Sequence, residues 1–177
     1  MTQIMLQQPV LERQENREIL AHWDSLRRGS ESPRRSSFSP MDLPRHLPHM
    51  IMLEPQLPAR ADIRIFGTEL VHRLGYDLTG QNMVELYKSD RNSMVLEFLS
   101  LVVAKQVVTV AYTTWTTPAG HKFMTENIWL PLVSEDGKVS RILGSLWELA
   151  PIDDDLVSLG ESLDEAEKLS ERSYYKF

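Results

Sequence analysis

The side chains that could do chemistry are few in this sequence and are not grouped. The five histidines show no i, i+4 pair and no H-x-x-x-H spacing; they are His22, His46, His49, His72 and His121. There are no cysteines, which excludes thiolate metal ligands, disulfides and a cysteine nucleophile. No metal site is therefore predicted.

Motifs of common enzyme sites are also missing. The chain has no G-x-S-x-G elbow, no Walker lysine loop and no G-x-G-x-x-G turn. Glu54, Glu69 and Glu85 stand at predicted helix starts and strand ends, where solvation and capping explain them. No catalytic residue is predicted, and we expect a protein that is not an enzyme. The alternative is a small α+β hydrolase or isomerase that uses Asn127 and His72.

Length and composition favour one domain with terminal extensions. The 177 residues are 42% hydrophobic and 25% charged, enough to bury a core. The N-terminus has no secretory signal pattern, and the longest uncharged run, Val107 to Gly120, is short and rich in threonine. A cytoplasmic protein without a membrane partner is therefore predicted.

Charge is unevenly placed along the chain. The net charge is −6, and the segment from Asp153 onward carries most of the acidic excess. The only basic cluster is Arg27, Arg28, Arg34 and Arg35, so a nucleic-acid partner is not predicted. We interpret that cluster as part of a solvated linker, with anion contact as the alternative.

Three segments follow from the residue pattern. Residues 1–39 hold an amphipathic helix at about 15–28, with Ile19, Trp23 and Leu26 on one stripe, and a linker rich in Ser, Arg and Pro. Residues 40–150 form the main domain. Residues 151–177 form an acidic tail, either a final amphipathic helix or a solvated, partner-binding end.

Within the main domain, strands enclose a block of helices. Strands are predicted over 49–54 and 63–66, helices over 67–74, 82–87 and 89–105, and three further strands over 107–148. The last three form a meander, because Pro118 to Gly120 and Asp136-Gly137 are turn signals. This order predicts an α+β domain in which helices cover one face of an antiparallel sheet.

Several segments resemble the PAS sensory domain family. They are Leu74-Gly75-Tyr76-Asp77-Leu78-Thr79-Gly80-Gln81-Asn82, the stretch from Gly120 through Leu130-Pro131-Leu132 to Ile142-Leu143-Gly144, and the opening from Trp23 to Glu54. The opening is similar to a PAS subfamily of alphaproteobacteria in which the domain often stands alone. The resemblance implies a bacterial signalling protein with five antiparallel strands, helices over one face and the N-terminal helix on or near the other.

The resemblance does not name a cofactor, because PAS domains bind haem, flavins, small acids or nothing. Flavin-binding photoreceptors of this family carry a reactive cysteine after the glycine that matches Gly80. Here the residue is Met83, and a thioether cannot form the photochemical thiol adduct, so that chemistry is excluded. Haem ligation by His72 is not expected, since a lone histidine is more commonly a surface or partly buried residue.

Alternation along the meander divides its side chains between two faces. By similarity to flavin-binding relatives, one face lies under the helices and forms a candidate ligand pocket. Its candidate residues are Tyr76, Met83, Tyr87, Phe98, Thr113, Trp115, Thr125, Asn127, Trp129 and Leu146. A few polar groups on an apolar wall are typical of such pockets. Alternatively, these groups bond to one another and the core is filled.

The opposite face is also largely apolar, so something must cover it. We predict that the N-terminal helix covers it across a homodimer, with the same helix as a lid in its own subunit as the alternative. The candidate interface residues are Ile19, Trp23, Leu26, Ile128, Leu130, Leu143 and Trp147.

Together these features predict a stand-alone PAS-type regulator. It would sense a small molecule or act through contacts with an unidentified protein partner, without its own output domain. A structural dimeric adaptor with a filled core is the alternative.

Overall fold

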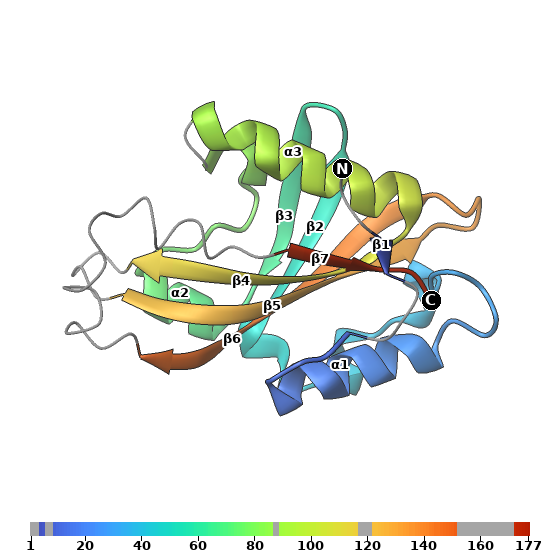
Figure 1. Cartoon of the computed structure of the whole chain (residues 1–177), viewed down its shortest axis with the longest axis horizontal. Helices are drawn as coiled ribbons and strands as arrows, with labels where there is room; N and C mark the ends of the chain where they lie inside the picture. The colour runs from blue at the N-terminus through green and yellow to red at the C-terminus, as the bar shows by residue number, and fades with distance from the viewer. Residues whose placement is uncertain (1–3, 6–8, 87–88, 117–121, 152–171) are drawn as a thin grey trace.

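The computed structural model describes residues 4–5, 9–86, 89–116, 122–151 and 172–177 (Figure 1). Its strands are β1 (Ile4–Met5), β2 (Met50–Gln56), β3 (Arg60–Phe66), β4 (Val108–Thr116), β5 (Lys122–Val133), β6 (Val139–Pro151) and β7 (Arg172–Tyr175). Its α-helices are α1 (Gln14–Ser25), α2 (Thr68–Leu74) and α3 (Ser89–Lys105). Four 3₁₀ turns, η1 to η4, cover Arg35–Ser37, Pro40–Asp42, Leu47–His49 and Met83–Leu86.

All strands belong to one sheet in the order β1-β7-β4-β5-β6-β2-β3. The five central strands from β4 to β3 are antiparallel, as predicted. The predicted count of five was wrong, because β7 pairs antiparallel with β4 and β1 pairs parallel with β7. Both additions come from the two ends of the chain, which the sequence analysis left without strands.

Local residues explain where the central elements end. Gly137 has φ +79° in the turn between β5 and β6, a conformation that favours glycine. Gly75 closes α2 in the left-handed conformation, and its N–H bonds to the carbonyl of Val71. Ser39 caps η2 by accepting a hydrogen bond from the Met41 N–H. The turn at Gly137 and the end of α2 at Leu74 agree with the predicted turn at Asp136-Gly137 and the predicted helix over 67–74.

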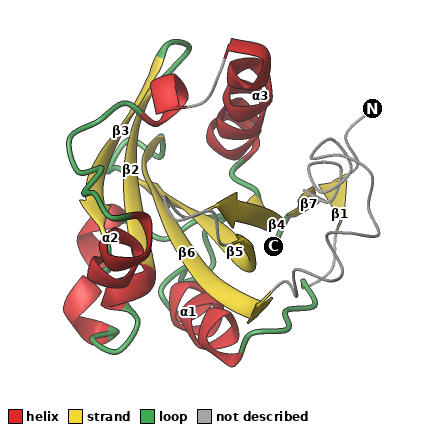
Figure 2. Ribbon diagram, turned by 90° about the vertical axis from the view of Figure 1, so that its left-hand side faces the viewer, coloured by secondary structure: helices red, strands yellow, loops and turns green. Residues whose placement is uncertain are grey.

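The sheet lies between α3 on one side and α1 on the other (Figure 2). An apolar core fills each side. The inner core lies under α2 and α3 and includes Leu53, Ile63, Phe98, Leu99, Val102, Trp129 and Ile142. The outer core lies under α1 and includes Ile19, Trp23, Phe38, Ile128, Leu130, Leu132 and Leu143. Successive residues of β5 and β6 alternate between the two cores, so the predicted assignment of faces is confirmed.

The segment between α1 and β2 is packed, unlike the solvated linker expected from its composition. The Val133 N–H donates to the Pro33 carbonyl at 2.9 Å, and Phe38 is buried in the outer core. Arg34 of the basic cluster pairs with Glu135 at 2.5 Å. Apolar Pro33 and Phe38 within a polar stretch are the reason that the segment is held against β5.

Candidate functional site

The two faces of β5 carry the polar groups that stand out in this fold. Asn127 and Thr125 point into the inner core, and Glu126 between them points into the outer core. All three are buried. Because strand side chains alternate, one strand links an inner polar group to an outer one.

The inner polar group consists of Thr113, Thr125 and Asn127. The Asn127 Nδ2 donates to Thr113 Oγ1 at 2.8 Å, and the Thr125 hydroxyl donates to the Thr113 carbonyl at 3.3 Å. The Asn127 side-chain oxygen Oδ1 is buried and has no hydrogen-bond partner among the described residues. A buried acceptor without a donor is costly, so this atom is suited to receive an N–H or O–H group.

Large side chains fill the inner core beside this group. Trp129 packs edge-to-face on Phe98 with ring centroids 5.5 Å apart. A Cβ added at Gly144 would stand 2.4 Å from the Trp129 ring, so the indole occupies the space above that glycine. Trp129 can lie across the sheet because Gly144 of β6 has no side chain there.

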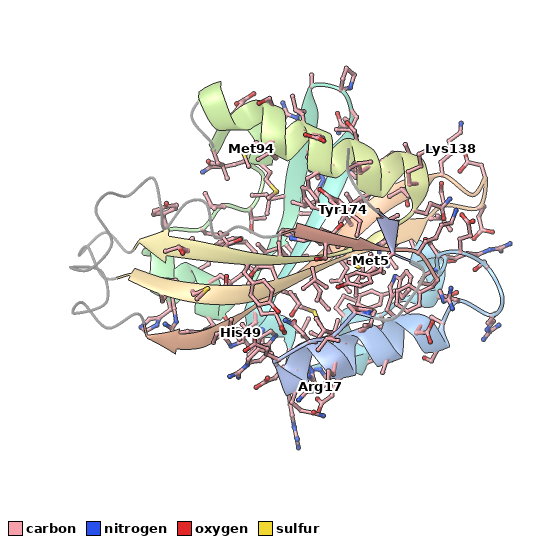
Figure 3. The ribbon with its side chains drawn as sticks, viewed as in Figure 1. Met5, Arg17, His49, Met94, Lys138 and Tyr174 are labelled. Carbon is pink, nitrogen blue, oxygen red and sulfur yellow. The ribbon has the colours of Figure 1, made fainter. Side chains whose placement is uncertain are left out.

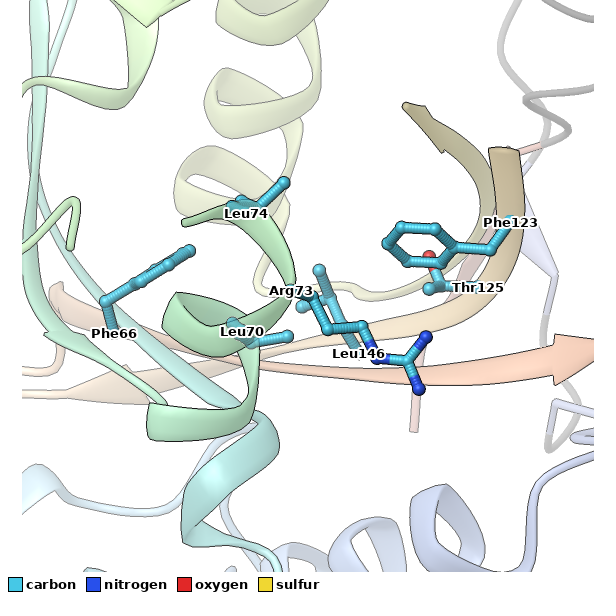
Figure 4. Close-up of a pocket in the computed structure, with 7 residues that line it drawn as sticks. All are labelled: Phe66, Leu70, Arg73, Leu74, Phe123, Thr125 and Leu146. Atoms are coloured by element: carbon cyan, nitrogen blue, oxygen red, sulfur yellow. The ribbon is translucent and has the colours of Figure 1, made fainter. Parts of the chain in front are cut away.

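A small cavity remains between α2 and the sheet (Figure 4). Its volume is about 20 Å³, room for about one water molecule. Phe66, Leu70, Arg73, Leu74, Phe123, Thr125 and Leu146 line it. Thr125 and Leu146, both predicted pocket residues, thus do reach a cavity.

Arg73 ties α2 to the sheet at this cavity. Its guanidinium pairs with Glu148 of β6, lies 3.4 Å from Glu69 and stands over the Phe123 ring at 5.3 Å from the centroid. Opening the cavity would require the Arg73 contacts with Glu148 and Phe123 to break, because they join α2 to β6 and β5.

The remaining predicted pocket residues divide into three groups. Met83, Phe98 and Trp129 are buried in the inner core. Tyr76 is a correction: its side chain is 53% exposed, because it follows the left-handed end of α2 and turns away from the core. Tyr87 lies outside the described residues, and Trp115 lies on β4 without a described side chain.

This interior does not fit a flavin or a haem. Cofactor pockets have volumes of roughly 300–1,000 Å³, far above the cavity under α2. Met83 is packed into the inner core, and His72 is exposed on α2. Neither His72 nor Asn127 lines the cavity under α2.

On the outer face, Glu126 is a fully buried carboxylate that holds the start of α1. It accepts hydrogen bonds from the N–H groups of Glu12 at 2.5 Å and Arg13 at 3.0 Å. The Asn16 Nδ2 donates to its Oε1 at 2.9 Å and to its backbone carbonyl at 3.0 Å. Arg13 is the N-cap of α1 and makes no side-chain cap of its own, so β5 supplies the cap. The positive end of the helix dipole also favours this carboxylate.

Tyr112 of β4 completes this arrangement, which we call the α1 clamp (Glu12, Arg13, Asn16, Tyr112 and Glu126). The Tyr112 hydroxyl donates to Glu126 Oε2 at 3.4 Å. Burial, and then the negative charge of Glu126, raise the pKa of Tyr112 to about 12. In the sequence, the signal for the clamp is the single carboxylate of Glu126 among otherwise apolar residues on one face of the strand, and no role was predicted for it.

The α1 helix of the same chain covers the outer face. Ile19 and Trp23 are completely buried, and the Trp23 Nε1 donates to the Pro131 carbonyl at 2.9 Å. Ile128, Leu130 and Leu143 are buried beneath the helix, and Leu26 is partly buried. Six of the seven predicted interface residues therefore pack within one subunit, the arrangement given above as the alternative.

Trp147, the seventh, lies at the edge of the outer face beside two histidines. Its ring stacks on His49 at 3.7 Å, and the His46 ring meets it edge-on at 5.9 Å. His46 Nε2 lies 3.0 Å from Glu18 Oε2 of α1. Burial lowers the pKa of His49, which bonds to the Leu146 carbonyl and is labelled in Figure 3.

Two kinds of feature are absent from the residues that the structure describes. No group of three or more His, Cys, Asp or Glu side chains there could hold a metal ion. Within the same residues, no helix is long and apolar enough to cross a membrane.

Comparison with known proteins identifies the family. The PAS domain family matches residues 11–147, from just before α1 to near the end of β6. This chain belongs to the PAS domain family, and its role is therefore that of a sensory or signalling domain. No curated protein matches it.

Solved structures to which this chain is similar include light-oxygen-voltage (LOV) domains. The dark structure of the blue-light photoreceptor Aureochrome1 LOV is 17% identical, with 75% of this chain and 89% of that chain covered and a TM-score of 0.48. A LOV domain studied with a flavin analogue is 16% identical, with coverage of 72% and 93% and a TM-score of 0.49. The Rhodobacter sphaeroides LOV protein is 14% identical, with coverage of 63% of this chain and 64% of that chain and a TM-score of 0.47.

Proposed function

We propose that this PAS protein passes a signal through protein contacts, with α1 as the element that responds. The α1 clamp carries the proposal: β5 holds the start of α1 through Glu126 and, one residue on, presents Asn127 to the inner core. A shift of β5 that weakens the clamp would loosen α1. The surface then uncovered is the apolar outer core, which a protein partner can bind.

The filled inner core favours signalling through protein–protein contacts over signalling through the binding of a large ligand. Trp129, Phe98 and the small cavity leave no room for a cofactor-sized molecule. A homodimer through the seven predicted interface residues requires α1 to move first, because six of them are covered or partly covered by the chain's own packing. That homodimer, the stand-alone character and the cytoplasmic location stay predictions.

Site-specific photocrosslinking in the host cell tests the proposal. A diazirine analogue of leucine replaces Leu143, which faces the outer core, or Leu146, which faces the inner core, as the matched control. Each is placed in the wild-type chain and in a Glu126→Gln chain. We expect a protein adduct at Leu143 that increases in the Glu126→Gln chain, and none at Leu146. Equal adducts at both positions, or none at Leu143 in either chain, would contradict the proposal.

A second candidate function is the sensing of a small neutral molecule at Asn127. The unpartnered Oδ1 of Asn127 favours it, since that buried acceptor can be satisfied by a ligand N–H or O–H. The inner polar group has no charged side chain, so a neutral ligand suits it better than an acid. The molecule would need to displace the Arg73 contacts to enter.

Native mass spectrometry of protein purified from its host tests this second function. We expect an added small mass on the wild-type chain and its loss in Asn127→Leu, with Thr114→Val on the other face of β4 as the control. A wild-type chain that carries no added mass would favour the filled-core adaptor.

A further inference from the structure

The open edge of β4 is completed by the last residues of the chain. β7 pairs with Val108–Ala111 in antiparallel register, and β1 pairs on its other side. Tyr174 enters the inner core and Tyr175 the outer core, and each is only 7% exposed (Tyr174 and Met5 are labelled in Figure 3). The C-terminal strand therefore occupies a specific site beside Val108–Ala111 that contacts both cores. We call this site the seat.

Further contacts hold the residues that follow β7. The Lys176 N–H donates to the Met5 carbonyl at 2.9 Å, and the Lys176 ammonium pairs with Glu31 at 2.8 Å. The Phe177 ring meets Trp23 edge-on at 5.8 Å, and Arg27 lies over the same ring at 5.2 Å. The seat is thus built by β4, β1, α1 and the segment after α1. Each of these would make the same contacts with residues 172–177 of another copy.

The connection to β7 is much longer than its path requires. β6 ends at Pro151 and β7 begins at Arg172, so 20 residues lie between them. From the strand order and register, the gap is about 20 Å, at roughly 4.8 Å per strand and 3.4 Å per residue. Twenty residues can span about 70 Å when extended. They carry eight carboxylates and one lysine.

We propose that the β4 edge is a strand-acceptor surface on which the β7 of a second copy of this chain replaces the chain's own β7, giving a dimer with exchanged C-terminal strands. The same contacts form in both arrangements, so the effective concentration of the chain's own strand sets the balance. A covalent connection between two binding elements gives an effective concentration of about millimolar order. The whole chain at micromolar concentration therefore keeps its own β7. Exchange of β7 between two copies is favoured when the connection between β6 and β7 (the tether) is shortened or cannot reach the edge of β4. This inference is independent of α1 movement and of a ligand.

Shortening the tether tests the proposal directly. Deleting residues 154–169 leaves four connecting residues, which span about 17 Å and cannot close the gap within one chain. We expect this variant to sediment as a dimer at micromolar concentration, under conditions in which α1 stays in place and the wild-type chain is expected to sediment as a monomer. The matched control replaces residues 154–169 by a Gly/Ser segment of equal length and should return to the monomer.

Two outcomes would overturn the proposal. A shortened chain that is folded and monomeric shows that the edge does not accept a second copy's strand. A dimer that persists when Tyr174→Asp is added to the shortened chain uses a different surface, because Tyr174 is buried in the seat.

A second measurement covers the case in which the shortened chain does not fold. A protease site is placed in the tether of the full chain, which is then cleaved and mixed with an isotopically labelled peptide of residues 170–177. We expect native mass spectrometry to show the labelled peptide in place of the cleaved strand, at one per protein. If the labelled peptide does not bind, the proposal is refuted. This holds whether the cleaved strand stays bound or dissociates.

Discussion

The two faces of the sheet use polar groups in opposite ways. On the outer face, the carboxylate of Glu126 has donors from Glu12, Arg13, Asn16 and Tyr112, and it fixes α1. On the inner face, Asn127 has one bond to Thr113 and an acceptor without a partner among the described residues. The outer group is a structural clamp, whereas the inner group has unused hydrogen-bonding capacity. A buried polar group can therefore fasten a fold or stand ready for a ligand, and its donors decide which.

The largest expected effect is at the clamp. Glu126→Ala removes the acceptor of several buried donors, so we expect it to lower the free energy of unfolding by about 3 kcal/mol or more. Glu126→Gln keeps one acceptor oxygen and should cost less. Urea denaturation measures both, with exposed Glu135→Ala as the control that should change little. Similar small effects of the Ala, Gln and control variants would show that Glu126 does not clamp α1.

The next largest effect tests how tightly the inner face is filled. In Gly144→Ala the new Cβ would meet the Trp129 ring, so we expect a loss of about 2 kcal/mol in unfolding free energy. Trp129→Phe in the same chain should make room and recover part of the loss, which a double-mutant cycle measures. Strictly additive effects would mean that Trp129 does not lie over Gly144.

A smaller effect concerns alkaline pH and Tyr112. Its pKa of about 12 in the folded chain exceeds the ordinary tyrosine value of roughly 10. Between these values the unfolded chain loses the phenolic proton first, so stability falls as pH rises from 10 to 12. We expect Tyr112→Phe to show a shallower fall in chemical denaturation across this range. Identical slopes in both chains would contradict burial of Tyr112 beside Glu126.

The smallest effect is expected at the inner polar group. Asn127→Leu loses the bond to Thr113 but also removes a buried acceptor without a partner, so the two changes offset. We expect the unfolding free energy to change by less than about 1 kcal/mol, measured by thermal and urea unfolding. A loss comparable to that of Glu126→Ala would make Asn127 a structural residue and erase the difference between the two faces.

The sequence predicted the central fold because its signals are local. Asp136-Gly137 marked the hairpin between β5 and β6, Gly75 marked the end of α2, and alternation along 122–133 assigned residues such as Ile128 and Trp129 to opposite faces. Period and turn chemistry act over a few residues, so they can be read without coordinates.

Tertiary structure decided what depends on distant partners. Glu126 lies 110 or more residues from its partners Glu12, Arg13 and Asn16, and β7 pairs with β4 across a long stretch of chain. No local pattern therefore predicts either pairing. Tyr76 turned outward, and the filled core around Trp129 depended on the missing side chain at Gly144. The sequence thus determined a two-faced PAS sheet with an amphipathic helix. Only the tertiary structure decided that α1 covers the outer face of the sheet in the same chain and that β7 completes the edge of β4. Both outcomes depend on which of several possible long-range contacts buries the apolar side chains best.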